Sequence, residues 1–428
     1  MDSIFQYNNI EHLHIELTNL CNASCPACPR FFKNSSLPAP GLDLNTWTLE
    51  DFKRRLPVDF LKNIKHINFC GNHGDPVACK ELLDILKYLS DIKIKVIEMH
   101  SNTGGKTSKT WSEIGKLFAK NPDWIMIFSV DGLEDTNHIY RRNIKWNKVE
   151  ENIKAFTQWG GKSDWDFLVF KHNEHQIEEA RQKATEWGVT NFVPKIPANV
   201  DKGTKLKPMP ANKNDGTTDY LIHAAENKEY RNELIDSEEE IIETLNFKPE
   251  NYEKQLERPL QIMKYKGKEP KPEWDKVKII PKCKKESGKS TIYIDANGTV
   301  VPCCWIGITL PAIKECKQSG STTDYITHQL DTKFNEHGGL DRLNLDKYSL
   351  KEVLGFNILG KMFEGGWDKT TKEGKIAQCS DFCGGKNIVD QIYTTTGNEN
   401  ERYDYLKDRW KERQDARRQN RKQSAFAT

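Results

Sequence analysis

The sequence predicts an α/β fold built on a parallel sheet, and three observations lead to this prediction. Between about residues 11 and 200, short apolar runs of strand length recur along the chain. Segments with apolar residues at helical spacing lie between these runs. Glycines close two of those segments, where a helix would end. Strands that alternate with helices predict right-handed βαβ units, in which neighbouring strands run parallel.

Six apolar runs are the predicted strands. They cover residues 12–17, 66–70, 94–99, 124–130, 165–170 and 191–195. In a parallel sheet the chemistry lies beyond the carboxyl ends of the strands. The loops that follow the strands are therefore expected to meet on one rim. Five of these loops begin near Thr18, Gly71, His100, Asp131 and Lys171.

Three apolar stripes with helical spacing predict helices between these strands. The stripes consist of Leu82, Leu83, Ile85, Leu86 and Leu89, of Val149, Ile153 and Phe156, and of Ile177, Ala180, Ala184 and Trp187. The second helix is expected to stop at Gly160–Gly161 and the third at Gly188, because glycine commonly ends helices. These helices complete the alternation that the fold requires.

The rest of the chain is expected to form three further regions. Residues 201–280 are rich in lysine and proline around a helix-prone stretch, and we interpret them as a solvated insertion or linker rather than a substrate lid. Residues 281–400 begin with a hairpin whose strands, 290–295 and 299–301, are joined at Asn297–Gly298. Residues 401–428 are interpreted as an exposed basic helical tail rather than a contact for a phosphate-bearing partner.

Composition argues against several classes of protein. Charged residues make up 29% of the 428, yet the formal net charge is only +2, so no global charge favours nucleic acid or an anionic membrane as partner. The longest apolar run, residues 124–130, is too short to span a bilayer. No basic region followed by an apolar core marks a secretory signal near residue 1. The expected location is the cytoplasm.

Eleven cysteines are the unusual feature of the composition. An odd number without a secretory signal argues against a disulfide framework and favours metal binding. Seven of them fall in tight groups, which are Cys21, Cys25 and Cys28, then Cys303 and Cys304, then Cys379 and Cys383. Cys70, Cys79, Cys283 and Cys316 stand apart. We interpret Cys70 and Cys79 as core or free thiols.

The first cysteine group directly follows the first predicted strand. Cys21, Cys25 and Cys28 are separated by three and then two residues, and Pro29 closes their loop. Three thiolates so close together can hold three corners of a cubane iron–sulfur cluster. The missing fourth cysteine leaves one iron open to a small ligand. Zinc is the alternative, but it would need a fourth protein ligand, and the nearby His12 and His14 lie on the preceding strand.

This cysteine spacing, with the lead-in at residues 17–22, resembles the signature of the radical S-adenosylmethionine superfamily. The position before the third cysteine is often aromatic in that family and is Ala27 here. The resemblance implies a partial (β/α)6 TIM-like barrel over residues 1–200. It also implies a [4Fe-4S] cluster on Cys21, Cys25 and Cys28 that binds S-adenosyl-L-methionine through its open iron.

Further segments resemble the places where that family contacts its cofactor. Residues 73–76 correspond to the family's Gly-Gly-Glu-Pro, with His73 and Asp75 as departures, and residues 100–104 resemble its Thr-Asn-Gly segment. The implied cofactor-binding residues are Gly74, Asp75, Pro76, Asn102, Ser129 and Arg141. The family assigns Ser129 and Arg141 to the ribose and the carboxylate, and the planar fork of an arginine suits a carboxylate. Taken singly, Gly-Asp-Pro reads as a common turn and Arg141 as a surface residue.

The later cysteines resemble the auxiliary-cluster domains called SPASM and twitch, placed at residues 281–400. The resemblance implies that Cys283, Cys303, Cys379 and Cys383 hold one auxiliary [4Fe-4S] cluster, as in the shorter twitch form. Structural zinc on the same four thiolates is the alternative. Cys304 is interpreted as a packed neighbour of a ligand, and Gly298 as the positive-φ residue of the hairpin turn.

The resemblance implies an enzyme that reductively cleaves S-adenosylmethionine to a 5′-deoxyadenosyl radical, which abstracts hydrogen from a substrate. Its electron donor would be a flavodoxin or a ferredoxin. We expect a peptide or protein as substrate, with oxidation of a small alcohol or sugar as the rival. Because the first cysteine is at position 21, no leader-binding domain is expected before it.

Two other functions remain as alternatives. A nucleic-acid-modifying enzyme would depend on the basic tail alone. A zinc-stabilised, non-catalytic binding protein is the alternative of a different class. The sequence identifies no catalytic side chain.

Overall fold

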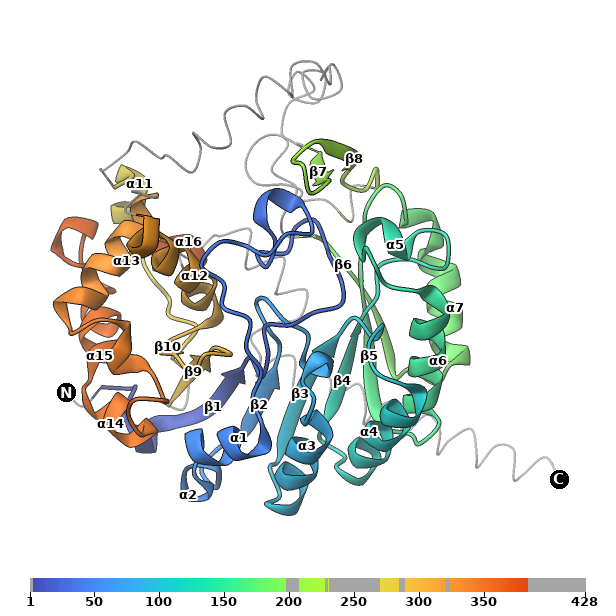
Figure 1. The fold of residues 1–428 in the computed structure, drawn as a ribbon, viewed down its shortest axis with the longest axis horizontal. Coiled ribbons are helices and arrows are strands. Elements are labelled where there is room, and N and C mark those ends of the chain that lie inside the picture. The colour runs from blue at the N-terminus through green and yellow to red at the C-terminus, as the bar shows by residue number, and fades with distance from the viewer. Residues whose placement is uncertain are drawn as a thin grey trace. The chain divides into compact units, whose positions relative to one another are not determined.

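Eight strands form one sheet in the order β10-β9-β1-β2-β3-β4-β5-β6 (Figure 1). Their bounds are β1 (Ile10–Ile15), β2 (His66–Phe69), β3 (Val96–Ser101), β4 (Ile125–Ser129), β5 (Lys162–Leu168), β6 (Asn191–Lys195), β9 (Ser290–Ile294) and β10 (Val300–Val301). Neighbouring strands from β9 to β6 run parallel, and β10 runs antiparallel to β9. The predicted α/β fold with a parallel sheet is therefore confirmed, with β1 to β6 in chain order.

The structure is a computed structural model that describes residues 3–197, 208–227, 230, 270–284, 289–319 and 324–383. These residues belong to the first of two compact units, 1–385 and 386–428. Two predicted features lie outside the described residues. They are the helical stretch after residue 230 in the 201–280 insertion and the basic tail at 401–428.

Helices connect the strands along one side of the sheet (Figure 1). Those of the first half are α1 (Leu49–Arg55), α2 (Val58–Leu61), α3 (Leu82–Asp91), α4 (Ser108–Lys120), α5 (Asn137–Tyr140), α6 (Trp146–Thr157) and α7 (Ile177–Glu186). The three predicted apolar stripes lie on α3, α6 and α7 and are largely buried. Gly115 lets α4 approach α6, since an added Cβ would lie 2.4 Å from the Phe156 carbonyl oxygen.

Side-chain alternation gives the sheet two different faces. On β1, Leu13 and Ile15 are 1% and 0% exposed and belong to the apolar core. His12 and His14 point the other way, to the inner face. Burial raises the pKa of the Cys70 thiol, which follows β2, to about 12.

The predicted hairpin at residues 290–301 is β9 and β10, and its turn contains Gly298 at φ +78°. Sequence patterns did not indicate its place in the sheet. β9 pairs in parallel with β1, with His12 opposite Thr291 and Ile15 opposite Ile294. The barrel sheet therefore continues past its first strand into the last third of the chain.

The remaining elements flank this sheet. A separate hairpin is formed by β7 (Met209–Asn212) and β8 (Thr218–Ile222). The later helices are α11 (Pro272–Lys276), α12 (Cys304–Ser319), α13 (Tyr325–Glu336), α14 (Leu350–Gly355), α15 (Ile358–Met362) and α16 (Ala377–Cys383). None of the helices in the described part of the chain combines the length and the apolar character needed to cross a bilayer.

Candidate functional site

The loop after β1 carries the first cysteine group, and hydrogen bonds fix it along its length. The Thr18 hydroxyl donates to the Asn45 carbonyl at 3.0 Å. The Ser24 N–H donates to the Arg142 carbonyl at 3.0 Å, and the Cys28 N–H closes a turn onto the Cys25 carbonyl at 3.0 Å. The three cysteines are thus held together beyond the carboxyl end of β1, where the fold was expected to place its chemistry.

Each thiol of this group receives an N–H donor. The Cys21 Sγ lies 3.4 Å from the Ala23 backbone nitrogen and 3.5 Å from the Asn102 Nδ2. The Cys25 Sγ lies 3.7 Å from the Arg141 Nη1. The backbone N–H of Arg30 faces the Cys28 Sγ and opposes the rise in the pKa of Cys28 that burial causes. Hydrogen bonds to sulfur are typical of thiolates that ligate an iron–sulfur cluster.

Burial shifts all three thiols toward their protonated forms. It raises the pKa of Cys21 and Cys25, and it raises that of Cys28 to about 12. A bound metal centre reverses this preference, because its positive charge deprotonates a coordinating thiol. The donor set therefore fits a metal centre: one buried and two partly buried thiols, each with an N–H donor positioned to stabilise the thiolate.

The loop after β2 holds three of the predicted cofactor-binding residues. An added Cβ on Gly74 would lie 1.8 Å from the Thr18 carbonyl oxygen, so a glycine is needed where the two loops meet. The Asp75 N–H donates to the Leu20 carbonyl at 2.9 Å. The Asp75 carboxylate accepts from the Ser101 hydroxyl at 3.1 Å and from the Asn102 N–H at 2.8 Å. Asp75 therefore joins the loops after β1, β2 and β3.

Pro76 opens the short helix Pro76–Ala78, which Asp75 caps by accepting from the Val77 N–H at 2.9 Å. Asn102 follows β3 and donates to the Asn22 Oδ1 at 3.0 Å, so it faces the cysteine loop. Ser129 is the last residue of β4 and stands opposite Asp166 on β5. Asn102 is thus brought to the cysteines, and Ser129 lies at a neighbouring strand end.

Arg141 reaches the cysteines from the segment after α5. Its Nε donates to the Asp131 Oδ2 at 2.6 Å, which leaves its Nη1 directed at Cys25. Asp131 is fully buried and also accepts from the Leu168 N–H at 2.7 Å. The sequence indicated Asp131 only as the start of a loop after a predicted strand. The structure adds it as the residue that orients Arg141.

Arg142 is a second residue that sequence reasoning missed. Its guanidinium donates to four backbone carbonyls, those of Ser24 at 2.8 Å, Asn34 at 3.1 Å, Ser35 at 2.8 Å and Asn212 at 2.9 Å. It therefore ties the cysteine loop to the following loop and to β7. No local pattern marks such a residue, since its partners are carbonyls far away in the sequence.

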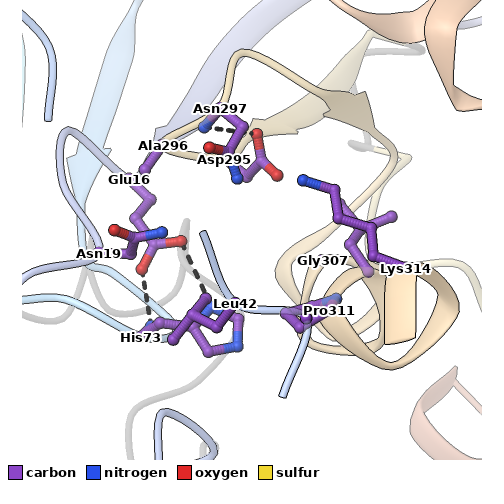
Figure 2. Close-up of a pocket in the computed structure, with 12 residues that line it drawn as sticks. Glu16, Asn19, Leu42, His73, Asp295, Ala296, Asn297, Gly307, Pro311 and Lys314 are labelled. Carbon is purple, nitrogen blue, oxygen red and sulfur yellow. Dashed lines mark hydrogen bonds and ion pairs between the residues drawn. The ribbon is translucent and has the colours of Figure 1, made fainter. Parts of the chain in front are cut away.

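Glu16 lies at one side of a small pocket between the β1 and β2 loops and α12 (Figure 2). Its Oε1 accepts from the N–H groups of His73 at 2.6 Å and Gly74 at 2.9 Å, and its Oε2 accepts from the Tyr293 hydroxyl at 2.7 Å. Burial raises the pKa of Glu16, but the His73 side chain, the Tyr293 hydroxyl and the His73 N–H together outweigh burial and lower it. Asp295 and Lys314 line the opposite side of the pocket (Figure 2).

The second set of cysteines also converges. Burial raises the pKa of Cys379 well above its usual value, and Cys383, Cys303 and Cys283 add to the rise. Burial raises the pKa of Cys303 to about 12, with Cys383 as the next cause. Such charge effects fall off with distance, so these three cysteines lie in the neighbourhood of Cys379. They come from the segments before and after the β9–β10 hairpin and from α16.

Across the described ranges, no three histidine, cysteine, aspartate or glutamate side chains converge closely enough to hold a single metal ion.

The inner face of the sheet below the cysteines is polar. His100 Nε2 lies 2.6 Å from Glu98 Oε1 on β3, and Lys195 Nζ lies 2.5 Å from Asp166 Oδ2 between β6 and β5. All four side chains are partly exposed, between 11% and 21%. Glu98, His100 and Asn102 are two residues apart, so their side chains lie on the same face of β3 and of the segment that follows it. The charged pair Glu98–His100 therefore lies on the face that leads to the cysteine site.

No protein-family model and no curated protein sequence matches this chain. Among solved structures it is similar to Streptococcus suis SuiB bound to precursor peptide SuiA, with 16% identity and a TM-score of 0.42 over 74% of this chain and 63% of that chain. It is similar to anSMEcpe with bound AdoMet, with 13% identity and a TM-score of 0.41 over 93% of this chain and 97% of that chain. It is also similar to BtrN in complex with AdoMet and 2-DOIA, with 11% identity and a TM-score of 0.37 over 90% of this chain and 97% of that chain.

This chain spans less than two thirds of the length of SuiB. None of these superpositions is close, so the function proposed below rests on this chain's own residues.

Proposed function

We propose that this chain is a radical S-adenosylmethionine enzyme with a [4Fe-4S] cluster on Cys21, Cys25 and Cys28. One observation carries the proposal: three thiols, one buried and two partly buried, share one loop at the carboxyl end of β1, and each has an N–H donor near its sulfur. Such a set leaves one iron without a protein ligand, open to the amine and carboxylate of S-adenosylmethionine. The bound cluster and cofactor supply an electron and a carbon-centred radical that abstracts hydrogen from the substrate.

The chain's own residues orient this chemistry. Arg141 presents its remaining N–H groups beside Cys25, where they suit the cofactor's carboxylate. Asn102 and Ser129 stand at the ends of neighbouring strands, where they suit the ribose hydroxyls. Asp75 keeps the surrounding loops together, so these donors hold their positions before any ligand arrives.

We further propose that Cys283, Cys303, Cys379 and Cys383 hold an auxiliary [4Fe-4S] cluster with no open iron. Their mutual effect on the pKa of Cys379 supports it. With both clusters present, the protein should contain about eight irons per chain. Zinc in place of iron would support the zinc-stabilised binding protein instead.

The substrate is proposed to be a peptide or protein, with a small alcohol or sugar as second candidate. The paired charges Glu98–His100 and Asp166–Lys195 on the inner face favour a polar substrate in either case. The two candidates are distinguished by measuring 5′-deoxyadenosine formation with a mixture of unstructured peptides and, separately, with a mixture of cyclic polyols and aminosugars. Peptides are expected to accelerate 5′-deoxyadenosine formation; acceleration by the polyols alone supports the second candidate.

The main experiment replaces Cys21, Cys25 and Cys28 together with alanine in the anaerobically reconstituted protein. The variant is expected to lose 5′-deoxyadenosine formation and about half of its iron. Cys316→Ala, on α12 outside both cysteine sets, is the matched control and should keep both. Undiminished 5′-deoxyadenosine formation by the triple variant contradicts the proposal.

A further inference from the structure

Arg30 is a buried cation beside the first cysteine group. The residue is only 6% exposed, although it follows Cys28 by two positions on a loop. Its guanidinium lies 5.5 Å from the centre of the Phe31 ring, and its Nη1 makes a long contact of 3.5 Å to the His73 carbonyl. Its buried Nε finds no hydrogen-bond acceptor among the described residues.

Two other arginines of the described residues, the buried Arg55 and the partly buried Arg141, have carboxylate partners. Arg55 has a side chain 4% exposed, and its Nη2 lies 2.7 Å from an Asp346 oxygen. Arg141 is paired with Asp131 at 2.6 Å. Within the described ranges, no carboxylate lies at ion-pair distance from Arg30. Burying a charge without a counter-charge costs several kcal/mol, so the structure indicates that a negative group completes this environment.

The anion is indicated by the neighbours of Arg30. Its positive charge acts on the Cys28 thiol and favours the thiolate, as does that of Arg141. The Phe31 N–H donates to the Cys28 carbonyl at 3.1 Å, so the chain turns back on Cys28 at Arg30. Asp131 already neutralises Arg141. Because Arg141 is already paired with Asp131, it cannot balance the charge of three thiolates. Arg30 has no carboxylate partner among the described residues and is therefore the cation that can balance part of that charge.

We propose that Arg30 is the counter-charge of the cluster on Cys21, Cys25 and Cys28, and that its guanidinium favours the reduced form of that cluster. This inference rests on the proposed function. A cluster ligated by three thiolates is anionic, and one-electron reduction by the external donor adds a further negative charge. A fixed cation in a buried site stabilises the more negative state and so raises the reduction potential. Arg30 acts through the cluster and is a positioning residue rather than a catalytic one.

The first test compares thermal stability with and without iron. In the cluster-free protein, Arg30→Met should melt at a higher temperature than the unchanged chain, because it removes an unpaired buried charge. In the reconstituted protein the order should reverse, because the variant then lacks the counter-charge. A purely structural arginine would lower the melting temperature in both states. The same order in both states therefore overturns the proposal.

The second test is an anaerobic redox titration followed by electron paramagnetic resonance. Arg30→Gln should shift the midpoint potential of the first cluster to a more negative value. Arg30→Lys keeps a positive charge there, so its midpoint potential should stay close to that of the unchanged chain. The auxiliary cluster is the internal reference and should not shift. Arg181→Gln, which removes an exposed arginine on α7, controls for net charge and should also cause no shift.

Other outcomes separate the possible failures. An unshifted potential in an Arg30→Gln variant with full iron content overturns the inference. A shift that appears only after S-adenosylmethionine is added also overturns it, since Arg30 would then serve the cofactor's carboxylate. If the unchanged chain binds no iron on Cys21, Cys25 and Cys28, the proposed function itself fails.

Discussion

At the scale of single residues, Gly74 determines whether the cysteine loop and the loop after β2 can meet. We predict that Gly74→Ala lowers the iron content at the first cysteine group, because its Cβ would lie 1.8 Å from the Thr18 carbonyl oxygen and backbone must move. Gly105→Ala is the control, since its nearest contact would be an ordinary 3.5 Å to Val77. Iron per chain checks the prediction, and equal loss in both variants contradicts it.

Asp295 is a buried carboxyl whose environment makes stability depend on pH. Burial raises its pKa from 3.8 to about 6, although the Asn297 and Thr299 N–H groups donate to it and Lys314 opposes the rise. Between these two values the folded state binds the proton more tightly than the unfolded state does. The protonated Asp295 carboxyl therefore contributes its full stabilisation of the folded state below about pH 4. This stabilisation is lost as the pH rises to about 6 and the carboxyl ionises.

Asp295→Asn is predicted to stabilise the protein above pH 6 and to leave it nearly unchanged below pH 4. A shift of about two pKa units corresponds to at most about 3 kcal/mol, since each unit is worth about 1.4 kcal/mol. The asparagine oxygen can still accept from the two backbone donors. Thermal unfolding at pH 4 and pH 8 checks this expectation. An equal gain at both pH values points to packing rather than charge.

At the scale of elements, the β9–β10 turn depends on Gly298. Its φ is +78°, a region that costs an L-residue about 1–2 kcal/mol, and an added Cβ would lie 3.2 Å from the Arg55 Nε. Gly298→Ala is predicted to lower the free energy of unfolding by at least that amount. Gly355→Ala at the end of α14 meets nothing within 4 Å and should be neutral or stabilising. Equal free energies of unfolding for the two variants contradict the prediction.

Local patterns indicated the parallel sheet, and the cysteine spacing indicated the first site. The apolar runs that became β1 to β6 were visible because buried parallel strands are apolar over most of their length. Three interactions of the site could not be predicted from the sequence. These are the ion pair of Arg141 with Asp131, the four carbonyls that accept from Arg142, and the hydrogen bonds to Glu16. These depend on contacts between residues far apart in the sequence, which no spacing or composition records. The pairing of β9 with β1 was missed for the same reason.

At the scale of the whole described unit, the second cysteine set lies on segments that are far apart in the sequence. Cys283 precedes β9, Cys303 follows β10, and Cys379 and Cys383 lie on α16. We predict that anaerobic removal of metal by a chelator opens residues 283–383 to a protease before β2 to β5 become accessible. The reason is that metal binding to such a set contributes directly to folding. Mass spectrometry of the fragments checks this, and cleavage spread evenly over both regions contradicts it.

The pairing of β1 with β9 has a consequence for synthesis. Glu16 and its partner Tyr293 are 277 positions apart, so the ribosome must add that length before one edge of the first strand finds its neighbour. At about 5–20 residues per second this takes tens of seconds. During that time β1 keeps a row of backbone N–H and C=O groups that can bind another nascent chain. The edge of β1 that pairs with β9 therefore stays uncovered until late in synthesis. Slower growth at low temperature with ample chaperone should raise the yield of intact protein.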